Sequence, residues 1–381
     1  MHRLRSTPGR LQLLWKSLTG SMPGLSPDGL EAHLHAAMAW LLRAQAASGD
    51  DGLPAYYDLA RGCWVASYPE TTGYAIPTLL AYARRFGRID VRQAALRMSE
   101  YELRTQLADG GFPGWAPRPG QRGGGVAFDT GQVLFGLLAT HAETGDERYA
   151  HTAVRAGDWL VAAQQPDGAW ADYHSQGSVR AIDTRTAWAL LCLAATSGDG
   201  RYRQAACRQL DWTLARQHPN GWFDSCTFDH RTAPVTHTLA YTTEGLLESG
   251  WLLGEERYVA SGRQAADALQ ERVEPNGRLA GAFDSTWQAA VRWTCLTGNV
   301  QCACIWMRLA EKTGTKTYAT VGERALRFVA MTQPLTTSVE ELHGSITGSW
   351  PLTGHYLRLK FPNWAAKFFV DAVLRWQSQR S

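Results

Sequence analysis

Two aspartates stand where a pair of carboxyl groups could move a proton. Asp129 and Asp183 each precede a threonine at the expected start of a helix, and 54 residues separate them. Hydrolysis or hydration of a sugar needs one carboxyl group to give a proton and a second group to steer water. We therefore expect Asp129 and Asp183 to form an acid/base pair. Plain helix capping is the structural alternative, because an aspartate side chain accepts hydrogen bonds from the free N–H groups of a helix start.

Three further residues are candidates for catalysis. Glu244 lies about two turns after His237 in an otherwise uncharged segment, so its carboxylate needs a solvent-filled cavity or a partner, such as a structural hydrogen bond to a neighbouring helix. His237 and Tyr356 suit a different chemistry. In a uronate lyase or C5-epimerase, a His or Tyr removes the C5 proton while an Arg or Asn, here Arg358 or Asn299, neutralises the carboxylate.

Aromatic and polar residues of the loops are candidates for holding the substrate. Sixteen Trp and thirteen Tyr are many for a chain of 381 residues. Their rings can stack on the apolar faces of sugars while polar neighbours reach the hydroxyls. The same rings could instead brace the hairpins, and any one histidine could be a satisfied structural group. The candidates for substrate contact are Trp115, Tyr173, His230, Trp287, Asn299, His343, Trp350, His355, Arg358, Asn363 and Trp364.

The elements that must position these residues repeat along the chain. An Asp-Gly or Asn-Gly pair, which favours a sharp turn, recurs about every 55 residues. After each turn a threonine opens an apolar segment of helix length, and the partner segments carry Ala and Leu at i, i+3 and i+4 among charged residues. The turns are Asp51-Gly52, Asp109-Gly110, Asp167-Gly168, Asn220-Gly221 and Asn276-Gly277, and the threonines are Thr71, Thr130, Thr184, Thr238 and Thr297.

These repeats predict an all-α fold in one domain. The apolar segments become inner helices, and the half-charged segments become outer helices at residues 28–46, 90–107, 147–164, 201–217, 256–272 and 315–332. A sixth inner helix is expected from Asn363, although the sixth Asn-Gly turn is missing. Because the repeats are longer than those of open solenoids, we expect six helical hairpins to close into a single (α/α)6 toroid over residues 27–381. A basic N-terminal extension, residues 1–26, precedes it, and the long loops gather around one mouth of the ring.

Composition limits the function classes. A net charge of +3 is too small to indicate nucleic acid as a partner, and the chain has no run of 18 apolar residues that would predict a membrane span. The apolar stretch of the N-terminus, LQLLW, is too short for a secretory signal, so we expect a cytoplasmic protein, with weak peripheral membrane contact through the N-terminus as an option. Seven cysteines form no framework, and Cys302 and Cys304 cannot chelate from one side of a helix. We expect neither a metal nor another cofactor.

Three segments resemble a known repeat. QLADGGF, QQPDGAW and QHPNGWF are similar to the Q-x-x-x-G-x-W repeats of triterpene cyclases, with a full match at Gln164, Gly168 and Trp170. Squalene-cyclase-like proteins are α/α toroids in which this motif ties outer helices together, so the resemblance implies the fold. The acidic D-x-D-D and D-D-x-x-D runs of isoprenoid enzymes are absent, and FDSTWQ lacks the Cys that prenyltransferases carry two residues after the position of Asp284. A terpene cyclase is therefore an alternative only.

The other resemblance is to six-hairpin glycosidases and polysaccharide lyases, which are also α/α toroids. Unsaturated uronyl hydrolases among them carry aspartates at the openings of two inner helices, as Asp129 and Asp183 do here. The stretch GSITGSWPLTGHYLRLKFPNWAAKFF and the CLTGN motif are similar to squalene-cyclase-like proteins of bacterial exopolysaccharide clusters, which implies a glycan context. We therefore expect an enzyme of the glycoside hydrolase type acting on an oligo- or polysaccharide, with a uronate-containing glycan as one option. The alternatives are a polysaccharide lyase or uronate C5-epimerase, a non-catalytic glycan-binding protein, and a terpene cyclase.

Overall fold

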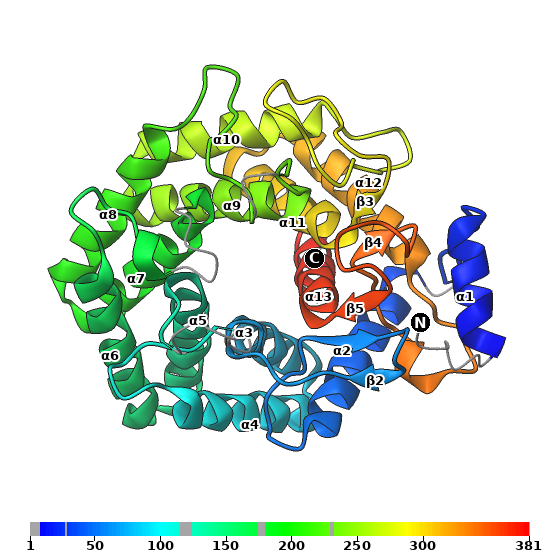
Figure 1. Cartoon of the computed structure of the whole chain (residues 1–381), viewed down its shortest axis with the longest axis horizontal. Helices are drawn as coiled ribbons and strands as arrows, with labels where there is room; N and C mark the ends of the chain where they lie inside the picture. The colour runs from blue at the N-terminus through cyan, green and yellow to red at the C-terminus, as the bar shows by residue number, and fades with distance from the viewer. Residues whose placement is uncertain (1–7, 27–28, 115–123, 174–179, 229–231, 381) are drawn as a thin grey trace.

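Two concentric rings of helices form the body of the computed structural model (Figure 1), which describes residues 8–26, 29–114, 124–173, 180–228 and 232–380. The inner ring consists of α3 (Pro69–Phe86), α5 (Ala127–Thr144), α7 (Thr184–Ser197), α9 (Thr236–Leu253), α11 (Leu296–Thr313) and α13 (Asn363–Ser378). The outer ring consists of α2 (Leu30–Ser48), α4 (Ile89–Thr105), α6 (Glu147–Ala163), α8 (Gly200–Leu214), α10 (Glu256–Gln270) and α12 (Lys316–Thr332). The expected all-α toroid of helical hairpins is confirmed.

The inner helices begin at or shortly before the threonines that mark them in the sequence. α13 begins at Asn363, as expected, whereas α3 begins two residues before Thr71 and α5 three residues before Thr130. This small shift matters for the site. It places Glu70 and Asp129 inside the first turns of their helices.

The ring closes by joining the two ends of the chain. The first outer helix, α2, packs against the last inner helix, α13, and α13 also packs against α3. Short strands strengthen this closure: β1 (Tyr56–Asp58) pairs antiparallel with both β2 (Cys63–Trp64) and β5 (Lys360–Pro362). A second pair joins β3 (Thr294–Cys295) to β4 (Ser349–Trp350). The loops that lead into α3, α11 and α13 are thus tied to one another at the mouth where the inner helices begin.

Glutamine side chains fix three of the sharp turns to the next outer helix. Gln164 Nε2 donates to the carbonyl oxygens of Gly168 and Ala205, at 2.9 Å each, so one amide holds both the turn and α8. Gln106 and Gln217 make the equivalent pair of bonds in the neighbouring repeats. The repeated glutamine therefore serves the scaffold.

The sixth turn is present although its Asn-Gly pair is missing. Gln333 Nε2 donates to the carbonyl of Gly344 at 2.7 Å and to that of His33, on α2, at 3.3 Å. Gly344 has a φ of +78°, and a Cβ at this position would collide with the carbonyl of Ala36. Glycine alone meets both conditions. This turn also completes the ring, because its partner is the first outer helix.

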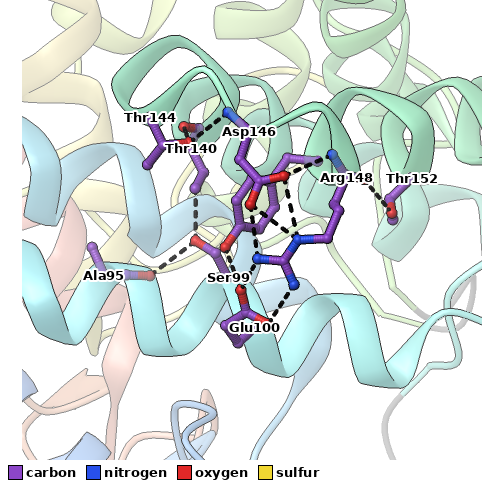
Figure 2. A network of polar contacts seen from close by, with 9 residues as sticks. Ala95, Ser99, Glu100, Thr140, Thr144, Asp146, Arg148 and Thr152 are labelled. Atoms are coloured by element: carbon purple, nitrogen blue, oxygen red, sulfur yellow. Dashed lines mark hydrogen bonds and ion pairs between the residues drawn. The ribbon is translucent and has the colours of Figure 1, made fainter.

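Polar side chains join neighbouring hairpins on the outside of the toroid (Figure 2). Asp146 caps α6 by accepting from Arg148 N at 3.0 Å, and Arg148 Nη2 reaches Glu100 on α4 at 2.7 Å. Next to this exposed network, the buried hydroxyls Ser99 Oγ and Thr140 Oγ1 lie 2.7 Å apart and link α4 to α5. Exposed ion pairs contribute only about 0–1 kcal/mol each, so the network orients the hairpins more than it stabilises them.

One helix lies outside both rings. α1 (Pro8–Leu18) sits at the edge of the toroid (Figure 1), in the stretch expected as an N-terminal extension. None of the helices within the described ranges is both long enough and apolar enough to cross a membrane.

Candidate active site

A pair of carboxyl groups lies where the first turns of two neighbouring inner helices meet. Glu70 stands in the first turn of α3 and Asp129 in the first turn of α5, and the two carboxyls are within hydrogen-bonding reach of each other. Tyr68, the N-cap residue of α3, donates its hydroxyl to Asp129 Oδ1 at 2.9 Å. Asp129 Oδ2 is buried and has no hydrogen-bond partner among the described donors. A proton shared with Glu70 would satisfy it.

Burial makes this pair hold a proton. Loss of solvation, and then the charge of Glu70, raises the pKa of Asp129 well above its usual range. Loss of solvation also raises the pKa of Glu70, against the hydrogen bonds from Tyr68 and Asp129 that lower it. Two carboxyls in contact cannot both ionise at low cost. The pair therefore binds one proton more tightly than two separate, solvated carboxyl groups would.

Neither aspartate of the expected pair caps its helix through its side chain. Asp129 is the third residue of α5, after the N-cap residue Val126, and Asp183 stands at the N-cap of α7 without a side-chain capping bond. Both aspartates are buried, as is Arg180. Burial lowers the pKa of Arg180, while the charges of Asp183 and then Asp129 raise it. The guanidinium thus lies in the field of both carboxyl groups.

A layer of neutral aromatic residues borders this region. His237 Nδ1 lies 2.5 Å from Gln301 Oε1, and the His237 ring centroid is 4.2 Å from that of Tyr241 and 5.6 Å from that of Tyr356. Trp364 Nε1 donates to the Tyr356 hydroxyl at 2.9 Å. Burial lowers the pKa of His237 to about 3 and raises the pKa of Tyr356 well above its usual range. Both side chains are therefore uncharged at neutral pH.

Arg185 of α7 contacts side chains from three other inner helices, α5, α9 and α13. It is buried, its Nε donates to Gln132 Oε1 at 2.9 Å, and its guanidinium forms an ion pair with Glu244. The guanidinium carbon also lies 4.9 Å from the ring centroid of Tyr241 and 5.7 Å from that of Phe368. Glu244 therefore has the partner that a carboxylate in an apolar helix requires.

A cavity of about 600 Å³ opens on the other side of this layer and reaches residues near the ends of α11 and α13. The charged residues of its wall form three ion pairs, namely Arg185–Glu244, Lys367–Asp371 and Arg375–Glu311. The carboxyl pair does not line this cavity. We place the candidate site at the carboxyl pair, because its proton and its unpaired buried oxygen are the features that chemistry requires, whereas the cavity's charges already neutralise one another.

Two residues expected to hold substrate support the hairpins. Trp287 is buried, and its Nε1 donates to the carbonyl of Asn220 at 2.9 Å. Asn299 Nδ2 donates to the carbonyls of Gly277, at 3.3 Å, and Ala325, at 3.0 Å. Asn299 therefore takes over, in its repeat, the role that glutamine has in the others.

Three more of the residues expected to hold substrate take part in the closure of the ring. Asn363 Nδ2 donates to the carbonyl of Pro54 at 2.9 Å, and Trp350 is buried within β4. The carbonyl of His343 accepts from Arg43 of α2. The exposed candidates are Tyr173, His355 and Arg358. Those outside the described residues are Trp115 and His230. Among the candidates between residues 343 and 364, Tyr356 thus lies against His237, and Trp364 bonds to Tyr356.

Sequence reasoning missed four residues of this region, Tyr68, Glu70, Arg180 and Arg185. Glu70 escaped because the expected inner helix begins at Thr71, one residue later. Acidic residues in the first turns of two neighbouring inner helices would have been the signal. Arg185 is a charged residue in an apolar segment, which is the feature that singled out Glu244.

Sequence comparison connects the middle of the chain to cyclases. The family described as squalene-hopene cyclase C-terminal domain matches residues 78–258. An ent-copalyl diphosphate synthase from Streptomyces sp. (strain KO-3988) is 39% identical over 88 residues, which cover 22% of this chain and 16% of that protein. The match therefore spans a small part of the curated relative.

Structural comparison covers nearly the whole chain. Unsaturated glucuronyl hydrolase from Bacillus sp. GL1 matches with a TM-score of 0.72 and 15% identity, over 91% of this chain and 96% of that chain. The chain has the six-hairpin glycosidase fold. An unsaturated glucuronyl hydrolase specific for heparin matches with a TM-score of 0.71 and 13% identity, over 92% and 97% of the two chains. The Streptococcus agalactiae enzyme matches with a TM-score of 0.66 and 12% identity, over 98% and 96%. At such low identity the six-hairpin likeness concerns the fold.

Proposed function

We propose that this chain is a carbohydrate-active enzyme of the glycoside hydrolase type, in which Asp129 delivers a proton to an oligo- or polysaccharide. The pair of buried Asp129 and half-buried Glu70 carries the proposal, since it keeps one proton at the start of the inner helices. Tyr68 orients Asp129 through its hydrogen bond. Asp183, near the same arginine, is our candidate for steering water.

The pair suits two related reactions. On a saturated glycoside, Asp129 protonates the leaving oxygen while water attacks the anomeric carbon. On an unsaturated uronide, the proton adds to C4 of the C4=C5 double bond and water adds to C5, and the hemiketal then opens and releases the aglycone. In both, the proton that water loses returns to the carboxyl pair. The fold shared with proteins named as unsaturated glucuronyl hydrolases favours the second reaction.

Two observations support an acidic glycan as substrate. The inner helices begin at this mouth, and a helix start carries a partial positive charge. The C-terminal stretch is similar to proteins of exopolysaccharide clusters. Arg180 adds no net positive charge to this support, because the carboxyl groups of Asp183, Asp129 and Glu70 lie in its field.

The test is incubation of the purified chain with acidic and neutral oligosaccharides, saturated and unsaturated, in deuterated water. Mass spectrometry and proton NMR follow cleavage and deuterium uptake. We expect cleavage, with deuterium at C4 if the substrate is an unsaturated uronide. Asp129→Asn should abolish the reaction, whereas Asp172→Asn, the same change on an exposed aspartate, should not. Glycans that bind unchanged in the wild type would sink the proposal and leave a glycan-binding protein.

The lyase or epimerase alternative requires a base for the C5 proton. Its candidates are Tyr356 and His237, and both are poorly suited, because burial keeps the phenol protonated and leaves the imidazole a very weak base. New unsaturation, or C5 exchange without cleavage, would favour this alternative. A cyclase is favoured by the sequence match over residues 78–258, so a prenyl diphosphate belongs in the same panel.

A further inference from the structure

α1 presents an apolar stripe to solvent. Leu11, Trp15 and Leu18 lie at i, i+4 and i+7 and therefore share one face of the helix. Their exposures are 48%, 69% and 56%. Among the described residues, these are three of the seven exposed large hydrophobic side chains, and they fall on one helix of 11 residues. A concentration of this kind marks an interaction surface rather than scattered surface leucines.

The opposite face of α1 is docked on the toroid. Leu13 is buried, and Ser17 Oγ accepts from Leu352 N at 2.6 Å. Gly9 lies so close to Ser338 and Val339 that a Cβ would press against both. The helix is therefore held in place by one side. Its exposed stripe is a fixed feature of the folded chain.

The charged side chains of the N-terminal stretch itself have one sign, whereas the exposed Glu340 and Glu341 follow Val339, against which Gly9 of α1 packs. The first 27 residues contain Arg3, Arg5, Arg10 and Lys16 and no acidic residue. An apolar face with a tryptophan, flanked by basic residues, is the composition of helices that lie in the plane of an anionic bilayer surface. A second copy of this chain on the same stripe would bring like charges together, which disfavours self-association.

We propose that α1 docks this chain peripherally on an anionic lipid surface, with Leu11, Trp15 and Leu18 at the boundary of headgroups and acyl chains. Lys16 contacts the lipid phosphates. Because α1 lies at the outer edge of the ring and not over its axis (Figure 1), docking leaves the axis of the toroid uncovered. A glycan could then reach the inner helices while the chain stays on the membrane.

The test is sedimentation of the full chain with vesicles of phosphatidylglycerol and phosphatidylcholine in equal parts, compared with phosphatidylcholine alone. We expect binding to the anionic vesicles that weakens as salt is added. Trp15→Ala and Leu18→Ala should each weaken binding roughly tenfold, the loss expected when one large apolar side chain no longer enters the bilayer boundary. Lys16→Glu should weaken binding to the anionic vesicles, also by roughly tenfold.

Matched controls come from other parts of the surface. Ile89 and Leu252 are 71% and 54% exposed on α4 and α9. Ile89→Ala and Leu252→Ala should bind as the wild type does, and circular dichroism should show that all variants are folded. Equal binding by the α1 variants and the wild type would overturn the proposal, and so would no binding to either vesicle. A dimer that Trp15→Ala dissociates, without vesicle binding, would assign the stripe to a second copy instead.

Discussion

Replacing Asp129 by asparagine should abolish turnover without disturbing the fold. The asparagine keeps the geometry, because Oδ1 can still accept from Tyr68 and Nδ2 can donate to Glu70 in place of the shared proton. What it lacks is a proton to give. General acid catalysis contributes about 10²- to 10⁴-fold to a rate, which corresponds to about 3–5 kcal/mol at 1.36 kcal/mol per tenfold. We expect kcat/KM to fall by this factor on any glycan that the wild type turns over.

The same substitution should raise stability at neutral pH. An aspartate in the unfolded chain titrates near 3.9, roughly, and burial raises the pKa of Asp129 in the folded chain. The folded state therefore binds the proton more tightly. Its contribution to the free energy of unfolding is complete below about pH 4 and is lost as the pH rises through the folded pKa. An asparagine side chain does not titrate, so the variant should escape this loss.

Thermal unfolding across about pH 4 to pH 8 tests the linkage. A gain on the order of 1 kcal/mol at neutral pH is expected from replacing a buried titrating group by a neutral donor, or roughly 2 °C in Tm for a chain of this size. The gain should vanish at the acid end. Asp172→Asn should show neither effect. An Asp129→Asn protein that still turns over substrate within about tenfold of the wild type would refute Asp129 as the proton donor, and lower stability at neutral pH would refute the shared proton.

The remaining predictions concern residues that hold the site in place. Gly344→Ala should lower the free energy of unfolding by roughly 3 kcal/mol or more, because the new Cβ both strains a left-handed backbone and collides with a carbonyl of α2. Gly314 is also left-handed but has open space around it, so Gly314→Ala should cost only roughly 1–2 kcal/mol. Chemical denaturation of the two variants compares these costs. Arg185→Met should cost about 3–5 kcal/mol by leaving Glu244 without its partner, and adding Glu244→Gln should restore most of it in the same assay. Because its pKa is about 3, His237 should show no NMR titration near neutral pH. Its contribution to the free energy of unfolding is complete above about pH 6.5 and falls as the pH drops toward 3. The His237→Gln variant should lack this pH dependence.

The helices could be predicted because their signals are local and repeated. An apolar segment that follows a sharp turn must bury itself, and five copies of that pattern in one chain reinforce one another. The sixth turn could not be found in this way, because His343-Gly344 lacks the Asn or Asp of the other turns. Its left-handed backbone comes from glycine alone, and the collision that excludes other residues involves α2, some 300 positions away in the sequence.

The candidate site could be predicted only in part, because its distances depend on how the ring closes. Asp129 and Asp183 stand out in the sequence as aspartates at helix starts. Glu70 becomes their neighbour only because α3 begins before Thr71 and packs beside α5. The prediction that Asn299 contacts the substrate failed for the opposite reason. An asparagine in a loop-to-helix segment looks available for substrate, yet its amide replaces a missing glutamine of the scaffold.

The two resemblances describe different parts of one molecule. The cyclase match covers residues 78–258, where glutamines such as Gln164 tie turns to outer helices. Those bonds belong to the scaffold and do not specify a reaction. Inside the barrel, Arg185 and Lys367 of the cavity wall are paired with Glu244 and Asp371, so neither carboxylate is left unpaired to stabilise the carbocations of cyclase chemistry. A proton shared by two carboxyl groups suits proton delivery to a sugar, so we assign the chemistry to the starts of the inner helices and the cyclase likeness to the repeated scaffold of helical hairpins.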